Sequence, residues 1–285
     1  MRRLSPSSTN STARASQNMT PMTILSETIP GIARELYDAR VGVYTVPYVS
    51  PRLPERDLDA AYAISAEFAA LRERNLGVRR VGRKVGLTNP NVQKRVGISE
   101  PDYGVIHDDM VFQSGVVLPK SRYNRLLIEA EVAFVLKSDI FDATLERVAA
   151  AIDYVTPAFE VVDFRYDGSV GQIVDTIADN AGCSGIVVGE EKHPYGSVDL
   201  KAVEMVITGG GKEITRGVGS NVLGDPINAV LWLADTAIRT GQPLRAGEVL
   251  LSGSIGYIEP WPVDVECVAT ITGLGRVVAS VDSKA

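Results

Sequence analysis

The spacing of apolar positions changes near residue 78, from a helical period to a mostly strand-like one. A first apolar stripe at helical spacing precedes Gly42 and consists of Ile29, Ile32, Ala33 and Leu36. A second begins after Asp57, a favourable N-cap residue, and ends near Gly77; it consists of Leu58, Ala61, Ile64, Phe68 and Leu71. The pattern therefore predicts a helical cap region over residues 23–77.

Beyond residue 78, short apolar runs are separated by Gly, Pro, Asp and Asn, which is typical of β-strands. The runs lie at residues 116–118, 128–136, 158–162, 186–188 and 202–208, and residues 263–281 alternate around a turn at 273–275. Two helices are expected between them, over residues 144–155 and from Asp225 to just before Gly241. This order predicts an α+β fold with a mixed β roll or barrel, and a β-rich catalytic domain over residues 78–285.

The N-terminal segment differs from the rest of the chain. Its first twenty residues contain five Ser, three Thr and three Arg, and no acidic residue. This composition is similar to that of an organellar transit peptide, but the segment lacks the apolar middle of a secretory signal. We expect a disordered leader over residues 1–22, or a functional start at Met19 or Met22.

Composition narrows the class of protein. Of 285 residues, 45% are hydrophobic and 22% are charged, which excludes a wholly disordered chain. The net charge of -6 argues against a nucleic-acid partner, which requires clustered Lys and Arg. No run approaches the ~18 apolar residues of a membrane helix, so no membrane partner is expected. The two cysteines, Cys183 and Cys267, are too few for a disulfide framework, and a reducing cytoplasm fits them.

The run 128–136 contains two acidic residues, Glu129 and Glu131, in an otherwise apolar strand. Side chains two residues apart in a strand point to the same face, where two carboxylates repel each other. A divalent cation would offset that repulsion in a buried site, whereas the solvent face of an edge strand is the alternative. Glu160 lies in the next acidic strand-like run, and three carboxylates without a nearby His or Cys favour Mg²⁺ or Mn²⁺.

Two further residues are candidates for acid–base chemistry. Lys84 lies between two glycines, in a pattern compatible with a desolvated amine or with an ordinary surface lysine. Asp102 lies in a predicted turn at 101–104, as an acid/base or as an ordinary turn residue. The glycines of 209–211 match no nucleotide-binding motif and indicate a hairpin turn.

Five segments together resemble a known family: GRKVGLT, EPDYGVIHDDM, IEAEVAFVL, PAFEVVDFR and DTIADNA, in this order from residue 82 to 181. They are similar to the 2-hydroxypentadienoate hydratase / 4-oxalocrotonate decarboxylase family of the fumarylacetoacetate hydrolase superfamily, from about residue 25 onward. The resemblance implies a β roll with an N-terminal helical cap. It also implies Mg²⁺ or Mn²⁺ on Glu129, Glu131 and Glu160, an active-site Lys84 and an acid/base Asp102, with Glu129 also counted as catalytic.

The function implied by the resemblance is that of a lyase. The leading interpretation is a hydratase that adds water to a 2-hydroxy-2,4-dienoate, or its 2-oxo-3-enoate tautomer, to give a 4-hydroxy-2-oxo acid in meta-cleavage of aromatic compounds. The alternatives are a 4-oxalocrotonate (2-oxo-3-hexenedioate) decarboxylase and a non-catalytic partner subunit of the same fold. Arg83, Arg165 and Ser254 are candidates for substrate binding.

Two departures from the family pattern concern specificity. The family's DNA run commonly continues with Ser, but Gly182 follows Ala181 here, and Tyr257 and Trp261 are bulky for a small dienoate. We expect a different or more aromatic substrate. The resemblance also implies a homo-oligomer, and association with another enzyme of the same pathway is a further expectation.

Overall fold

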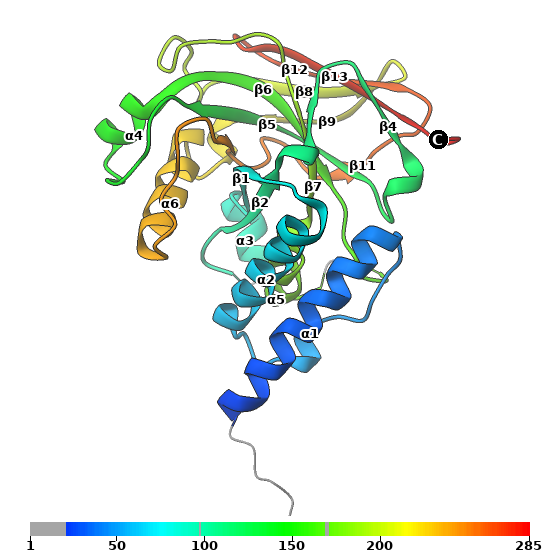
Figure 1. Cartoon of the computed structure of the whole chain (residues 1–285). Coiled ribbons are helices and arrows are strands. Elements are labelled where there is room, and N and C mark those ends of the chain that lie inside the picture. The colour runs from blue at the N-terminus through cyan, green and yellow to red at the C-terminus, as the bar shows by residue number, and fades with distance from the viewer. Residues whose placement is uncertain (1–20, 97, 169–170) are drawn as a thin grey trace, which may run out of the picture.

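The computed structural model describes residues 21–96, 98–168 and 171–285, and it has a helical part below two β-sheets (Figure 1). Most of the predicted leader, residues 1–20, lies outside the described residues. The helices are α1 (Pro21–Gly42), α2 (Leu58–Leu76), α3 (Pro90–Val96), α4 (Leu145–Ala151), α5 (Ile173–Ala178) and α6 (Pro226–Arg239). Among the described helices, none combines the length and the apolar character needed to cross a membrane.

The larger sheet has eight strands in the order β2-β1-β10-β5-β6-β7-β3, with β11 paired to β5. Its strands are β1 (Arg80–Gly86), β2 (Asp102–His107), β3 (Val111–Gln113), β5 (Leu127–Leu136), β6 (Ile152–Val162), β7 (Cys183–Val188), β10 (Val249–Leu251) and β11 (Glu259–Pro260). The pairs β1–β10 and β3–β7 are parallel, and the other pairs are antiparallel.

The smaller sheet has five strands in the order β4-β13-β12-β8-β9. They are β4 (Val116–Pro119), β8 (Glu204–Gly209), β9 (Lys212–Val218), β12 (Glu266–Ile271) and β13 (Gly275–Asp282). Strands β8 and β9 form the hairpin predicted at the 209–211 glycines. The predicted α+β fold with mixed sheets is confirmed, and the described strands form two sheets without closing into a barrel.

The helix α2 begins and ends where the sequence predicts. The Asp57 carboxylate accepts a hydrogen bond from the backbone N–H of Ala60 at 2.9 Å, and Gly77 adopts a left-handed φ of 70° after the last turn. The apolar side of α2 packs against α1 and α5 in a separate hydrophobic cluster. The helical part therefore includes α5, which the chain contributes long after residue 77.

Two local predictions are wrong. The helix predicted over 144–155 ends at Ala151, and Ile152 already begins β6. Apolar residues of this segment fit both periods, but Tyr154 and Val155 pair with β5, and Pro157 disfavours a helix before it. The turn predicted at 101–104 is also wrong, because Asp102 is the first residue of β2.

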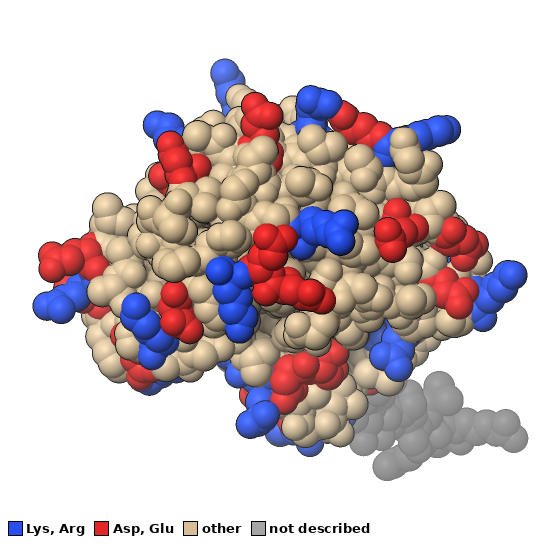
Figure 2. All heavy atoms as spheres, turned by 90° about the horizontal axis from the view of Figure 1, so that it is seen from above, with Lys and Arg blue, Asp and Glu red and all other residues tan. Residues whose placement is uncertain are grey.

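The main hydrophobic core lies between the two sheets and extends to α6. Both cysteines are buried in the protein and form no disulfide. Seen from above, the face over the smaller sheet carries basic and acidic side chains interspersed, without a continuous basic patch (Figure 2). The three glutamates predicted to bind a cation lie instead on strands β5 and β6 of the larger sheet.

Candidate active site

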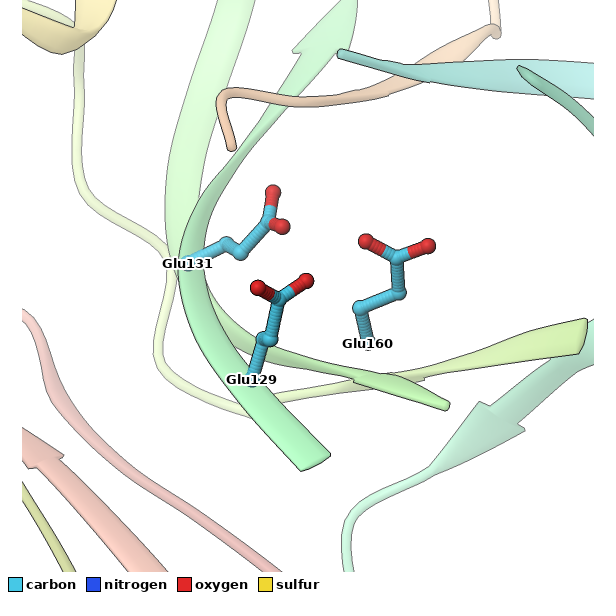
Figure 3. A group of neighbouring side chains, drawn as sticks. All are labelled: Glu129, Glu131 and Glu160. Carbon is cyan, nitrogen blue, oxygen red and sulfur yellow. The ribbon is translucent and has the colours of Figure 1, made fainter. Parts of the chain in front are cut away.

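Three glutamates meet at the centre of the larger sheet. Glu129 and Glu131 project from β5, and Glu160 projects from β6 toward them (Figure 3). Glu129 and Glu160 are direct partners across the antiparallel β5–β6 pair, so the backbone register brings their side chains together. One carboxylate oxygen from each residue lies within 4.8 Å of the others. Glu131 and Glu160 are fully buried, which rules out the solvent face of an edge strand.

The carboxylate oxygens of this cluster have few donors. Glu131 Oε2 accepts the backbone N–H of Gly253 at 2.6 Å, but Glu131 Oε1 and both oxygens of Glu160 accept no hydrogen bond within the described protein. Buried polar atoms are normally paired, and unpaired carboxylate oxygens are the ligands that Mg²⁺ and Mn²⁺ prefer. The residues present therefore fit a hard divalent cation.

The electrostatics of the cluster lead to the same conclusion. Burial, followed by repulsion from Glu160, raises the pKa of Glu129 to about 7; Lys84 and a contact with Ser254 partly oppose this rise. Burial and the two neighbouring carboxylates raise the pKa of Glu131 well above its usual range. A protein without a bound cation therefore holds these carboxylates at a cost in free energy.

Lys84 and Asp102 complete the charged part of the site. Lys84 is buried on β1, with its Nζ 3.2 Å from Glu160 Oε1. Burial by itself lowers the pKa of Lys84, but Glu160, Asp102 and Glu129 outweigh this effect and raise it above its usual range. The interpretation of Lys84 as an ordinary surface residue is therefore wrong.

Asp102 lies on β2, across from Gly86 of β1. It is almost fully buried, and neither carboxylate oxygen has a hydrogen-bond partner among the described residues. Burial raises its pKa to about 6, although Lys84 opposes the rise. A Cβ on Gly86 would lie 2.2 Å from Asp102 Oδ1 and 3.3 Å from Lys84 Nζ, so the glycine leaves the space in which these groups meet. A carboxyl group with a pKa near neutrality can both donate and accept a proton.

A cavity of about 260 Å³ opens from these charged groups. Its polar lining includes Lys84, Asp102, Glu129, Thr88, Asn89 and Ser254. The rest of the lining is mostly apolar or aromatic, and includes Val85, Leu87, Val92, Val162, Phe164, Ala181, Tyr257 and Ile258. The cavity thus combines a charged end with an apolar wall.

The structure places the three substrate-binding candidates differently. Ser254 lines the cavity, and its buried Oγ makes no hydrogen bond within the described protein. Arg83 points elsewhere: its Nη2 donates to the Gln242 carbonyl at 2.8 Å, and its Nε lies 3.6 Å from Glu248. Arg165 forms a buried ion pair with Asp179, also away from the cavity. The structure does not bring either arginine to the site.

Several lining residues lie in the five segments that carry the resemblance but are not among the predicted site residues. Leu87 and Ala181 adopt left-handed φ angles of 56° and 52°, which cost free energy for residues with a Cβ and are frequent at functional sites. Neighbouring Asn180, at φ 55°, bonds through its side chain to both backbone groups of Val105, which fixes this loop against β2. Of the two bulky residues, Tyr257 lines the cavity, whereas Trp261 is buried against Phe159.

Known proteins are similar to this chain in sequence and in fold. Residues 77–282 match the model of the fumarylacetoacetate (FAA) hydrolase C-terminal family. The chain is 40% identical over 249 residues to 2-keto-4-pentenoate hydratase of Paraburkholderia xenovorans (strain LB400), covering 86% of this chain and 91% of the relative. It is 37% identical over 246 residues to 2-hydroxyhexa-2,4-dienoate hydratase of Comamonas testosteroni, covering 85% and 93%.

Solved structures also share the fold of this chain. The 4-oxalocrotonate decarboxylase from Pseudomonas putida G7, complexed with magnesium and adipate, matches with a TM-score of 0.85 and 29% identity, over 90% of this chain and 98% of that one. Fumarylpyruvate hydrolase from Pseudomonas aeruginosa, in complex with Mn²⁺ and pyruvate, shares the fold at 15% identity, with a TM-score of 0.56 over 72% of this chain and 90% of that one. The resemblance noted in the five sequence segments is confirmed: the chain belongs to the fumarylacetoacetate hydrolase C-terminal family, and its most similar relatives include both hydratases and a decarboxylase.

Proposed function

We propose that the chain is a divalent-metal-dependent hydratase that converts a 2-hydroxy-2,4-dienoate, through its 2-oxo-3-enoate tautomer, into a 4-hydroxy-2-oxo acid in aromatic meta-cleavage catabolism. The observation that supports the proposal is a cavity lined by Lys84, Asp102 and Glu129 and otherwise largely apolar, with Glu131 and Glu160 clustered beside Glu129. The names of the 37–40% identical relatives support the same reaction. Mg²⁺ and Mn²⁺ are the expected ions.

Glu129, Glu131 and Glu160 would hold the cation, which supplies Lewis-acid stabilisation of the negative charge that develops on the substrate's carboxylate and 2-oxygen. Lys84, on β1 and beside Glu160, would stabilise the same negative charge on the substrate. Ser254 offers a buried hydroxyl for a hydrogen bond to the bound acid. These groups orient the carboxylate end of the substrate.

Proton transfer is assigned to Asp102. In the first step the 2-hydroxyl loses its proton and C5 gains one, which moves the double bond to C3–C4. In the second step water adds across this bond, its oxygen to C4 and a proton to C3. Asp102 is the group at the cavity whose pKa of about 6 suits it to carry these protons at neutral pH.

The alternative reaction is decarboxylation of 2-oxo-3-hexenedioate, whose second carboxylate would occupy the distal part of the cavity. That carboxylate needs a cationic partner when it is removed from water. Among the described residues, Lys84 is the only Lys or Arg that lines the cavity, and it already faces Glu160. The apolar wall therefore favours hydration over decarboxylation. A non-catalytic partner subunit would have no need for the unpaired carboxylates.

The test is the loss of ultraviolet absorbance of 2-hydroxypenta-2,4-dienoate and of 2-oxo-3-hexenedioate, with Mg²⁺, Mn²⁺ or EDTA, while released CO₂ is measured. We expect metal-dependent loss of the dienoate without CO₂. Release of CO₂ from the diacid would instead assign the decarboxylase reaction. If neither compound reacts while the protein binds metal, the hydratase proposal fails for these two substrates, and either a bulkier substrate or a non-catalytic subunit becomes the better description.

The cellular setting is part of the proposal. A homo-oligomer in the cytoplasm, associated with another enzyme of the same pathway, follows from the family resemblance. Light scattering coupled to size-exclusion chromatography tests the first of these expectations.

A further inference from the structure

The apolar wall of the cavity depends on a contact between two residues, Phe164 and Gly182. Phe164 follows β6 and lines the cavity, while it also packs against the hydrophobic cluster of the helical part. Gly182 has a left-handed φ of 72° and lies next to the Phe164 ring. A Cβ on Gly182 would lie 2.6 Å from Cζ and 2.7 Å from Cε1 of Phe164. The ring can occupy its position only because residue 182 has no side chain.

This contact explains the departure at position 182. A Ser or Ala there would push the phenyl ring away from its position, and Val162 Cγ1 lies 3.1 Å from the same added Cβ. Val162 also lines the cavity. The missing side chain at 182 therefore sets the position of the Phe164 ring in the wall of the cavity.

The remaining lining at this end is also uncharged. Val92 approaches from α3, and Tyr257 and Ile258 approach from the loop before β11. Tyr257 and Ile258 are 57% and 41% exposed, so apolar surface at this wall remains open to water. Covering such surface with an apolar group is favourable, whereas a carboxylate would lose its hydration without gaining a cationic partner.

We propose that Phe164, admitted by Gly182, is a specificity-determining residue, and that the substrates are 2-hydroxy-2,4-dienoates with an uncharged alkyl or aryl substituent on C5. The inference rests on the proposed hydratase function and names its substrate class. Each buried methylene contributes about fourfold in binding. A propyl substituent, which has two more methylenes, should therefore raise kcat/KM about 16-fold over methyl, and a carboxylate substituent should lower it.

The experiment measures kcat/KM of the Mg²⁺-loaded enzyme for dienoates with hydrogen, methyl, propyl, phenyl or carboxylate on C5. In Gly182→Ala, the ring can no longer occupy its position in the wall, so the propyl-to-hydrogen ratio of kcat/KM should fall about tenfold. Gly211→Ala is the matched control: its φ of 77° imposes the same backbone strain, but no atom lies within 4 Å of the added Cβ. Its ratio should equal that of the wild type.

Phe164→Ala tests the ring without backbone strain, and its propyl-to-hydrogen ratio should also fall because the apolar contact is lost. If Gly182 acts through the ring, adding Gly182→Ala to Phe164→Ala should change the ratio no further. The inference is overturned if the wild type prefers the unsubstituted or carboxylated dienoate, or if Phe164→Ala leaves the ratio unchanged. Absence of turnover of every dienoate would instead overturn the hydratase proposal itself.

Discussion

Two of the buried clusters of charged side chains in the described part of the chain, around Arg165 and around Glu160, differ in how many of their atoms have partners. Around Arg165, the Nε and the backbone N–H donate to the Asp179 carboxylate, Nη1 donates to Ser184 Oγ, and Nη2 donates to the Asp179 carbonyl. In the glutamate cluster, Lys84 is the ion-pair partner of Glu160 Oε1, but Glu131 Oε1 and Glu160 Oε2 have no partner among the described residues. The first cluster is complete within the protein, and the second is not.

This difference separates a structural role from a functional one. A buried ion pair whose donors and acceptors are all satisfied holds its surroundings in one arrangement, and removing one partner is costly. A buried group of unpaired carboxylates costs free energy unless a cation or substrate joins it. The two clusters should therefore respond in opposite ways to substitution: one in stability, the other in activity.

The largest effect is expected for Glu160→Gln. The variant loses a cation ligand with little change in shape, so kcat should fall about 10³-fold, equivalent to ~4 kcal/mol of transition-state stabilisation. Mg²⁺ should raise the melting temperature of the wild type but not of the variant. Glu248→Gln, which removes a buried carboxylate outside the cavity, is the control and should keep the response to Mg²⁺. An undiminished Mg²⁺ response in Glu160→Gln would contradict the assignment of the cluster.

For the arginine cluster, Asp179→Ala should lower the free energy of unfolding by about 3–5 kcal/mol, because it leaves the Arg165 charge buried without its partner. Urea denaturation measures this change. Asp235→Ala breaks an exposed pair with Arg239 and should change stability by less than about 1 kcal/mol. Equal effects of the two substitutions would remove the basis of the comparison.

Asp102→Asn should change the stability of the protein in a pH-dependent way and should also lower its activity. The pKa of about 6 in the folded protein exceeds the value of ~3.9 in an unfolded chain. Between these values the folded state keeps a proton that the unfolded state releases, so this contribution to stability is present below pH ~4 and lost by about pH 6. The metal-free Asp102→Asn variant does not lose this contribution. Its free energy of unfolding, relative to that of the wild type, should therefore rise by about 3 kcal/mol between pH 4 and pH 7.

Urea denaturation of both metal-free proteins across this pH range checks the prediction, and kcat of Asp102→Asn with Mg²⁺ should fall about 10²–10⁴-fold. A pH-independent difference in stability would show that the carboxyl group titrates normally despite its burial.

The smallest effect is expected at two neighbouring serines. Ser254 Oγ lines the cavity beside the Glu129 carboxylate, so Ser254→Ala should change stability little and raise KM about tenfold by removing a hydrogen bond to substrate. Ser252 Oγ accepts the Val132 N–H at 3.3 Å, so Ser252→Ala should instead cost about 1 kcal/mol of stability. A KM unaffected by Ser254→Ala would remove this residue from the substrate site.

The sequence predicted the parts of the site that depend on local geometry. Two glutamates separated by one strand residue must share a face, and Asp57 and Gly77 bound a helix through their own backbone preferences. Even so, Glu160 lies across from Glu129 because of the register between β5 and β6, and no local sequence pattern contains that register. The resemblance, rather than spacing, supplied that contact.

Other features needed three-dimensional information. Whether Arg83 or Arg165 reaches the cavity depends on their ion-pair partners, Glu248 and Asp179, and neither pairing follows from a local sequence pattern. The role of Gly182 required the position of the Phe164 ring. A helical period over 144–155 was misleading because burial on β6 selects the same apolar residues.

The register of β5 against β6 has a consequence for how this family can change. The three glutamates lie on central strands, held by neighbours on both sides, whereas much of the apolar wall comes from loops and from α3. Substitutions in those loops can alter which acid enters without moving the groups that activate it. Hydratases and a decarboxylase among the relatives of one chain are what such a division of labour would produce over evolutionary time.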